Sequence, residues 1–163
     1  MKFTVLIVAV LASVLGLLIF QKYSASDKLM KEKKIHRFDI ITLNGDTIIF
    51  SKDSFPKKLI FNFYSSSCDI CMFEVNDIVS FSTKNDIDVL FITADSLESM
   101  RNFARDIGNK GGRITFAKIA LVDAEKLFGE LTVPQTILFD EGLEIKKIKK
   151  GLVSTGLLNK SFE

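Results

Sequence analysis

Residues 58–71, Lys-Leu-Ile-Phe-Asn-Phe-Tyr-Ser-Ser-Ser-Cys-Asp-Ile-Cys, join an apolar run to a pair of cysteines. The run over residues 58–64 is short, rich in aromatic and branched side chains and followed by a serine cluster, which predicts a buried strand. From Cys68 to about Lys84 the apolar residues recur at helical spacing, so we expect a helix that begins at Cys68. Cys71 would then lie one helical turn after Cys68, close enough to form a disulfide with it.

The start of a helix gives the first cysteine a special environment. Unsatisfied backbone N–H groups and the helix dipole favour the thiolate of Cys68, and a C-x-x-C pair in a strand-helix pattern indicates a redox motif. A zinc site needs about four ligands, whereas the chain has two Cys and a single His, His36. A purely structural disulfide and a pair of inert core cysteines are also compatible with the spacing, although closing so short a loop gains little chain entropy.

Strands and helices are predicted to alternate around this segment. Before it, Asn44-Gly45 lies between two apolar runs and predicts a β-hairpin over residues 38–50. After it we expect a strand over 88–93, a helix over 99–107 preceded by Ser96 and ended by Lys110-Gly111-Gly112, an ambiguous segment over 114–119, a helix over 123–128, a hairpin over 136–149 and a terminal helix over 155–160. This order predicts an α/β fold with a central mixed β-sheet flanked by helices.

The N-terminus has a different composition from the rest of the chain. Residues 3–20 are an uncharged apolar run of 18 residues, within the roughly 17 to 25 that span a bilayer. The run has no polar face, which disfavours a buried core helix. We therefore expect three parts: a retained membrane anchor or a cleaved signal segment over residues 1–23, a Lys-rich tether over residues 24–35 and one folded domain over residues 36–163.

Charge excludes some classes of function and leaves the orientation of the anchor open. Residues 1–37 carry seven Lys or Arg and two acidic residues, whereas residues 38–163 carry 15 and 18, so the domain shows no sign of a nucleic-acid site. The lysines after the apolar run favour a cytoplasmic domain, but long domains translocate largely regardless of charge. With two Cys, two Pro and nine Gly, the chain is not a disulfide scaffold, a collagen or a disordered protein.

Residues 38–153 resemble the membrane-anchored thioredoxin-like thiol-disulfide oxidoreductases of bacteria, the TlpA/ResA-like family. The matching features are the hairpin at Asn44-Gly45, Asn62 six residues before the first Cys, the Cys68-Cys71 pair, Glu74 three residues after the second Cys, and Val133-Pro134-Gln135-Thr136 before a strand. The resemblance implies a thioredoxin-like fold with an N-terminal β-hairpin extension and a cis bond before Pro134. The residues themselves indicate no metal, nucleotide or haem pocket, so we expect no cofactor and no metal.

The resemblance also implies roles for individual residues. Cys68 would attack a substrate disulfide and Cys71 would resolve the mixed disulfide. Glu74 would carry a proton for the resolving step, and Val133 and Pro134 would bind an extended substrate peptide.

Three of the matching residues have simpler interpretations. We expect Glu74 to be partly buried by Phe63 or Phe73; the alternative is that it is a surface carboxylate of the helix. Asn62 either hydrogen-bonds near the dithiol or merely satisfies backbone groups. For Pro134 the alternative to a cis-proline at the site is an ordinary loop proline before a strand.

The chain departs from the family pattern beside the cysteines, where Ser67 replaces a Trp and Ile70 replaces a Pro. These changes leave the redox potential unpredicted, and the charge of Asp69 would oppose the helix dipole. A second candidate function is a peroxiredoxin-like thiol peroxidase, for which Ser65-x-x-Cys68 is a loose match but Phe61 stands where a proline is expected. A third is a redox-inactive thioredoxin-like binding module.

The resemblance implies a location and partners as well. The domain would be extracytoplasmic, held in the cell envelope by the anchor of residues 1–23 and recharged by a membrane electron donor. Its partners would be protein disulfides or dithiols, such as the apocytochrome c thiols of cytochrome c maturation, and no nucleic acid.

Overall fold

The computed structural model describes residues 37–108, 113–129 and 131–162, together with Ile35 and some residues between positions 7 and 17. Within this described part, no helix is both long and apolar enough to cross a membrane. Most of the predicted anchor over residues 1–23, nearly all of the tether over residues 24–35, and His36 lie outside it.

The described domain alternates strands and helices in the predicted order. Its elements are β1 (Asp39–Thr42), β2 (Thr47–Ile49), β3 (Leu59–Phe63), α2 (Asp69–Asn85), β4 (Asp88–Thr93), α3 (Leu97–Ile107), β5 (Ile114–Lys118), α4 (Leu121–Phe128), β6 (Gln135–Phe139), β7 (Ile145–Lys150) and α5 (Thr155–Phe162).

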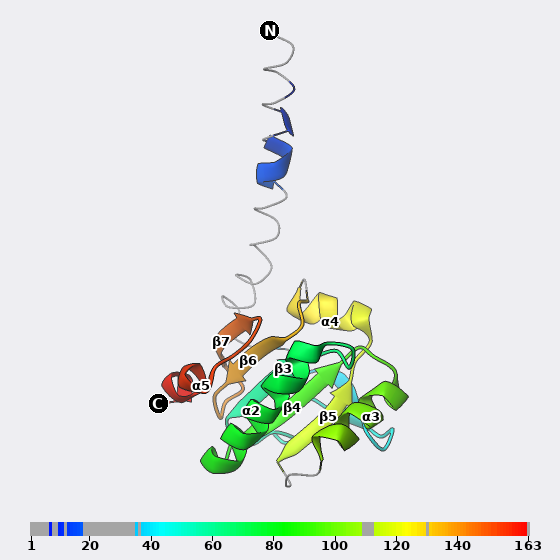
Figure 1. The fold of residues 1–163 in the computed structure, drawn as a ribbon, viewed down its shortest axis with the longest axis vertical. Coiled ribbons are helices and arrows are strands. Elements are labelled where there is room, and N and C mark those ends of the chain that lie inside the picture. Colours follow the sequence, from blue (N-terminus) through cyan, green and yellow to red (C-terminus); the bar gives the residue numbers. More distant parts are fainter. Residues whose placement is uncertain are drawn as a thin grey trace.

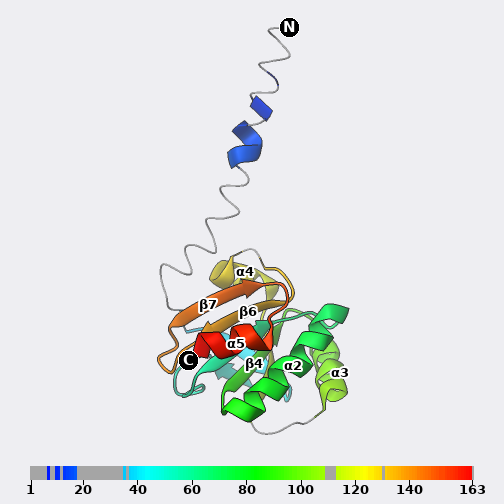
Figure 2. The ribbon, with the colours of Figure 1, turned by 60° about the vertical axis from the view of Figure 1, so that its left-hand side comes forward.

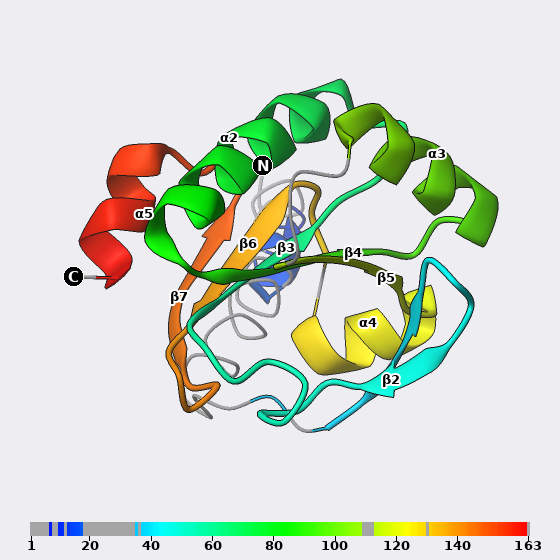
Figure 3. The same cartoon turned by 90° about the horizontal axis from the view of Figure 1, so that it is seen from below.

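The strands form one mixed sheet in the order β2-β1-β5-β4-β3-β6-β7, which confirms the predicted architecture. The central strands β3, β4 and β5 are parallel, and both edges are antiparallel: β1 pairs with β2 and β5, and β6 pairs with β3 and β7. Figure 1 shows the sheet with its helices, and Figures 2 and 3 show α5 beside α2 on the same side of the sheet.

The sheet separates two hydrophobic cores. Side chains of α2, α3 and α5 pack on one face, and α4 packs with Phe50 and Phe55 on the other (Figure 3). Successive side chains of β3 and of Tyr64 directly after it alternate between these cores, with Ile60 and Tyr64 toward α2 and Phe61 toward α4. Asn62 therefore lies on the α2 face, in the middle of an entirely buried strand.

The structure corrects several element boundaries and resolves the ambiguous segment. Residues 114–118 are a strand, β5, parallel to β4. Helix α4 begins at Leu121 rather than Asp123, and its N-cap, Ala120, makes no side-chain cap hydrogen bond that would have marked the start. Helix α3 ends before Gly108, which has a φ of 77°. The predicted break at residues 110–112 lies outside the described residues.

Phe61 is the test of the core under α4. Its side chain is 1% exposed, and its ring centroid lies 5.0 Å from that of Phe128 and 6.1 Å from that of Phe50. Phe61→Ala should lower the free energy of unfolding by about 3–5 kcal/mol, measured by urea denaturation. The matched control is Phe73→Ala, because Phe73 is 73% exposed; it should change stability by no more than about 0.5 kcal/mol. Equal losses in the two variants would contradict this view of the core.

Candidate active site

The two cysteines lie at the start of α2, as predicted, and form a disulfide with each other. Cys68 is the N-cap residue, with φ −99° and ψ 102°, and its sulfur accepts a hydrogen bond from the Cys71 amide at 3.2 Å. Cys71 is fully buried, whereas Cys68 is partly exposed. The outer sulfur thus lies among the free N–H groups of a helix start, where a thiolate is stabilised.

The loop before β6 leaves the sheet at the same edge as the segment that leads to the dithiol. The Val133–Pro134 peptide bond is cis, as the resemblance implies. In the sheet, Gln135 at the start of β6 pairs with Phe63 at the end of β3, so this loop and the segment leading to Cys68 leave the sheet at the same edge. Pro134 is buried, and its carbonyl accepts from Gly151 at 2.8 Å, while Val133 is 43% exposed.

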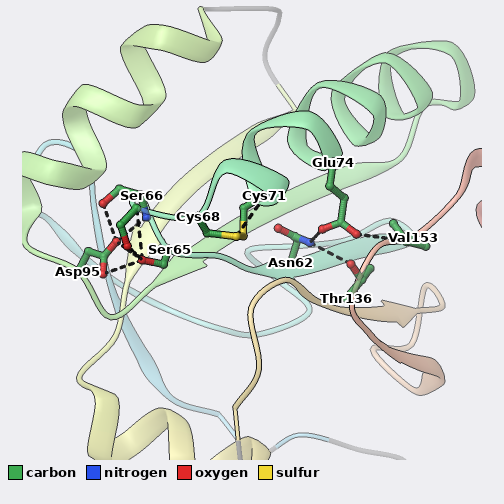
Figure 4. Close-up of a disulfide and its surroundings, with 10 residues drawn as sticks. Asn62, Ser65, Ser66, Cys68, Cys71, Glu74, Asp95, Thr136 and Val153 are labelled. Atoms are coloured by element: carbon green, nitrogen blue, oxygen red, sulfur yellow. Dashed lines mark hydrogen bonds between the residues drawn. A yellow bond between two sulfur atoms is a disulfide. The ribbon is translucent and has the colours of Figure 1, made fainter.

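Glu74 is buried, so its interpretation as a surface carboxylate is wrong. It is 1% exposed. One oxygen, Oε2, accepts from Asn62 Nδ2 at 2.8 Å, and the other, Oε1, accepts from the Val153 amide at 2.6 Å (Figure 4). Phe73 does not cover it as expected, because that side chain is largely exposed. Helix periodicity explains the difference, since Glu74 follows Cys71 by three residues on the buried side of α2.

Burial also changes the acidity of Glu74. Desolvation raises the pKa of this carboxyl above its ordinary value, while the hydrogen bonds from Val153 and Asn62 act in the opposite direction and the charge of Asp77 adds to the increase. A carboxyl with a raised pKa can gain and lose a proton nearer to neutral pH than a surface glutamate can.

The side chain of Asn62 binds other side chains near the dithiol rather than backbone groups. Its Nδ2 donates to Glu74 and, at 2.9 Å, to Thr136 Oγ1, its register partner on β6. In Figure 4 the amide lies between the disulfide and Glu74, with its oxygen on the side of the sulfur atoms. Within the described residues this buried Oδ1 has no hydrogen-bond partner. Asn62 is thus a side-chain link between two strands and the active-site helix.

Thr136 was expected only as part of the segment after Pro134, with no role of its own, and Asp95 was not expected at the site. Thr136 is one of two polar residues at the start of β6, and its place beside an apolar run was the available signal. Asp95 follows β4, and its carboxylate accepts from the Ser66 amide at 2.6 Å, the Ser66 hydroxyl at 2.7 Å and the Ser65 hydroxyl at 3.2 Å. In Figure 4 this cluster lies on the opposite side of Cys68 from Glu74. An acidic residue after a central strand could have indicated it.

The chemistry available at the site is that of the sulfurs and the buried carboxyl. Among the residues described, no group of three or more His, Cys, Asp or Glu side chains could hold a metal ion.

Comparison with solved structures supports the predicted fold. The chain is similar to the exposed lipoprotein thioredoxin Etrx1 from Streptococcus pneumoniae, with 17% identity, a TM-score of 0.64 and coverage of 77% of this chain and 97% of that chain. It is also similar to the thioredoxin domain of a thiol-disulfide oxidoreductase from Bacteroides vulgatus, with 15% identity, a TM-score of 0.66 and coverage of 78% and 93%.

A third similar structure is a secreted disulfide oxidoreductase of Mycobacterium tuberculosis, homologous to DsbE of E. coli, with 16% identity, a TM-score of 0.62 and coverage of 76% and 92%. The sequence matches no protein-family model and no curated protein.

The buried state of Glu74 predicts a pH dependence of stability. The raised pKa means that the folded chain keeps a proton that the unfolded chain releases above about pH 4.5. Stability should therefore fall as pH rises from 4.5 through the raised pKa, by about 1.4 kcal/mol for each pH unit between the two pKa values. Glu74→Gln cannot titrate, so urea unfolding of the oxidised variant between pH 4 and about pH 8 should lack this fall.

The comparison with Glu74→Gln removes the contribution of other carboxyls. Hydrogen bonds lower the pKa of Asp95 and Asp140 against the opposing effect of burial, and those residues are the same in both proteins. Parallel stability curves for the two proteins would contradict the prediction, because they would show that Glu74 has the same pKa in the folded and the unfolded chain.

The hairpin β1–β2, the order of the mixed sheet and the likeness to these solved structures show that the chain has a thioredoxin-like fold.

Proposed function

We propose that this protein is a thiol-disulfide oxidoreductase that reduces protein disulfides through Cys68 and Cys71. The observation that carries the proposal is the disulfide itself: it closes at the N-terminus of α2, with one sulfur partly exposed and the other buried beside a carboxyl of raised pKa. A purely structural cross-link needs neither an exposed sulfur nor a titrating neighbour. The names of the structural neighbours, a thioredoxin and two disulfide oxidoreductases, are in accord with this chemistry.

The reaction is a two-step exchange. The Cys68 thiolate attacks one sulfur of a substrate disulfide, so a Cys68–substrate bond forms, the substrate S–S bond breaks and the second substrate sulfur leaves as a thiolate. Cys71 then loses its proton and attacks Cys68 Sγ, which forms the Cys68–Cys71 disulfide and releases the first substrate sulfur. Two electrons pass from the protein to the substrate, and a dithiol donor restores the protein by the reverse exchange.

Glu74 takes part in the second step. It lies one helical turn beyond Cys71 on the buried side of α2 and accepts the Cys71 proton in its ionised form. Asn62 supports this step because its Nδ2 fixes Glu74 Oε2, and Thr136 in turn fixes Asn62. A raised pKa suits the proton exchange, because the carboxyl then titrates closer to the pKa of its partner.

The substrate binds at the loop before β6. Val133, directly before Pro134, is partly exposed. It lies in a loop, and among the loop and turn hydrogen bonds of the described residues its backbone N–H and C=O pair with no other backbone group. These groups are free to pair with an extended peptide that carries the target disulfide. The loop leaves the sheet at the same edge as the segment before Cys68, so the peptide would pass beside the sulfurs.

The protein acts in the cell envelope, tethered by residues 1–23, with its domain outside the cytoplasmic membrane. The apolar run over residues 3–20 supports the tether, and two neighbours are named as an exposed lipoprotein and a secreted protein. A membrane electron donor would serve as the dithiol donor, and the substrates would be envelope proteins, such as apocytochromes c whose thiols must stay reduced.

Variants of the two cysteines test the exchange. Cys68→Ser should abolish reduction of insulin disulfides, because no nucleophile remains at the exposed position. Cys71→Ser should form the first bond but not resolve it, so a mixed disulfide with insulin should accumulate and disappear on addition of dithiothreitol. Turnover by Cys68→Ser would contradict the mechanism, and consumption of hydrogen peroxide without insulin reduction would favour a thiol peroxidase.

The fate of the N-terminal segment tests the tether. The full chain, produced in bacteria with a C-terminal tag, should remain in the membrane fraction after an alkaline carbonate wash and be open to protease in spheroplasts. A chain that begins at residue 24, behind a cleavable export signal, should be released as a soluble protein. Recovery of the full-length product from the periplasm without residues 1–23, determined by mass spectrometry, would show a cleaved signal instead of an anchor.

A further inference from the structure

The segment that delivers the chain from β3 to Cys68 consists of three small polar residues. Ser65 and Ser66 are half-buried and Ser67 is exposed, so apolar packing does not fix the position of this segment. Within the segment, the Cys68 amide donates to the Ser65 carbonyl at 3.1 Å. The Ser65 hydroxyl contacts the Ser67 hydroxyl at 3.1 Å and accepts from the Ser67 amide at 3.4 Å. A single charged side chain, Asp95, binds this segment from outside, among the hydrogen bonds of the described residues.

We propose that Asp95 is a positioning residue for Cys68: its carboxylate holds the Ser65–Ser66 backbone in the arrangement that places the Cys68 sulfur at the N-cap of α2. This inference rests on the proposed exchange chemistry, in which the thiolate of Cys68 is the attacking group.

The pairing of β3 with β4 fixes the position of Asp95 beside the Ser65–Ser66 segment. Strands β3 and β4 are parallel neighbours, with Phe63 opposite Ile92, and the pairing extends one residue further through the Tyr64 amide and the Ile92 carbonyl at 3.0 Å. Ser66 and Asp95 are each three residues beyond that matched pair, so the two chains leave the sheet side by side. The Asp95 amide is itself fixed by Thr93 Oγ1 at 3.1 Å.

The hydrogen bonds that Asp95 accepts are of the strong kind. The Ser66 amide and hydroxyl donate at 2.6 and 2.7 Å to the same oxygen, Oδ2, and bonds to an ionised acceptor are shorter and stronger than neutral ones. Burial alone would raise the pKa of Asp95, but the bonds from Ser66 and Ser65 outweigh it and lower the pKa. The carboxylate therefore stays ionised at neutral pH and keeps its hydrogen bonds to Ser65 and Ser66.

Two variants separate the effect of the Asp95 hydrogen bonds from the effect of its negative charge. Asp95→Asn keeps an acceptor oxygen for the Ser66 amide and removes the charge, whereas Asp95→Ala removes both. The other acidic groups on the helix that begins after Cys68 are Asp69, Glu74 and Asp77 on α2, which stay unchanged. Asp106→Ala is the matched control, because Asp106 is an exposed residue of α3.

The experiment measures Cys68 in the reduced full chain by its rate of alkylation with iodoacetamide as a function of pH, and insulin reduction in parallel. Asp95→Ala loses a negative charge, which favours the thiolate, but it also releases the segment, so the Cys68 thiolate loses part of its helix stabilisation. We expect the second effect to be the larger, so the midpoint of alkylation should move to higher pH, and insulin reduction should slow about tenfold. In Asp95→Asn the midpoint should move to lower pH, because a negative charge is gone and the segment is still held. Asp106→Ala should match the wild type in both measurements.

The outcomes distinguish this inference from the proposed function. If Asp95→Ala and Asp95→Asn shift the alkylation midpoint in the same direction, or both match the Asp106→Ala control, Asp95 does not position Cys68. If the wild type does not reduce insulin, the proposed function fails, but the alkylation midpoints still decide the role of Asp95. Should Asp95→Ala fail to fold, Ser66→Ala provides the second test, and it should shift the midpoint upward by a smaller amount than Asp95→Ala would.

Discussion

The burial of β3 in the middle of the sheet is the constraint on which the site depends. All five residues of this strand are buried, and it is paired along its whole length with β4 on one side and β6 on the other. That double pairing fixes where the chain leaves the sheet, and Cys68 follows within five residues of Phe63. A slip of one residue would turn Asn62 away from α2 and bring Phe61 there, because strand side chains alternate between faces.

The polar groups beside the disulfide lie inside an apolar core, and most of them are satisfied by partners on other elements. Glu74 on α2 is bonded by Asn62 on β3 and by the Val153 backbone before α5, and Thr136 on β6 completes the set. Two buried polar atoms, Asn62 Oδ1 and the Tyr64 hydroxyl directly after β3, lack partners within the described region. Natural proteins seldom leave buried polar atoms without a partner, and the exceptions are concentrated at functional sites.

Much of this fold could be predicted because its signals are local. The run Asp-Val-Leu-Phe-Ile-Thr over residues 88–93 is a strand with the predicted bounds, and Cys68 and Ser96 cap the helices that follow them. The failures also have local causes. The start of α4 has no capping side chain at Ala120, and the short β5 mixes apolar and polar residues without a clear period. Residues 1–35, where the strongest hydropathy signal lies, are for the most part outside the described structure.

The amino-acid sequence alone predicted the order of the strands and helices except for β5, the dithiol at the start of a helix and the proline before β6, since each depends on neighbours within a few positions. Folding brought together the groups that surround the sulfurs. The hydrogen bonds that define them join residues 12, 74 and 79 positions apart around Asn62 and Glu74, and 29 positions apart between Ser66 and Asp95. Such contacts follow from strand register and helix packing, which no local pattern encodes. The burial of Glu74 and the hydrogen bonds between Asp95 and Ser66 could therefore be found only in the folded chain.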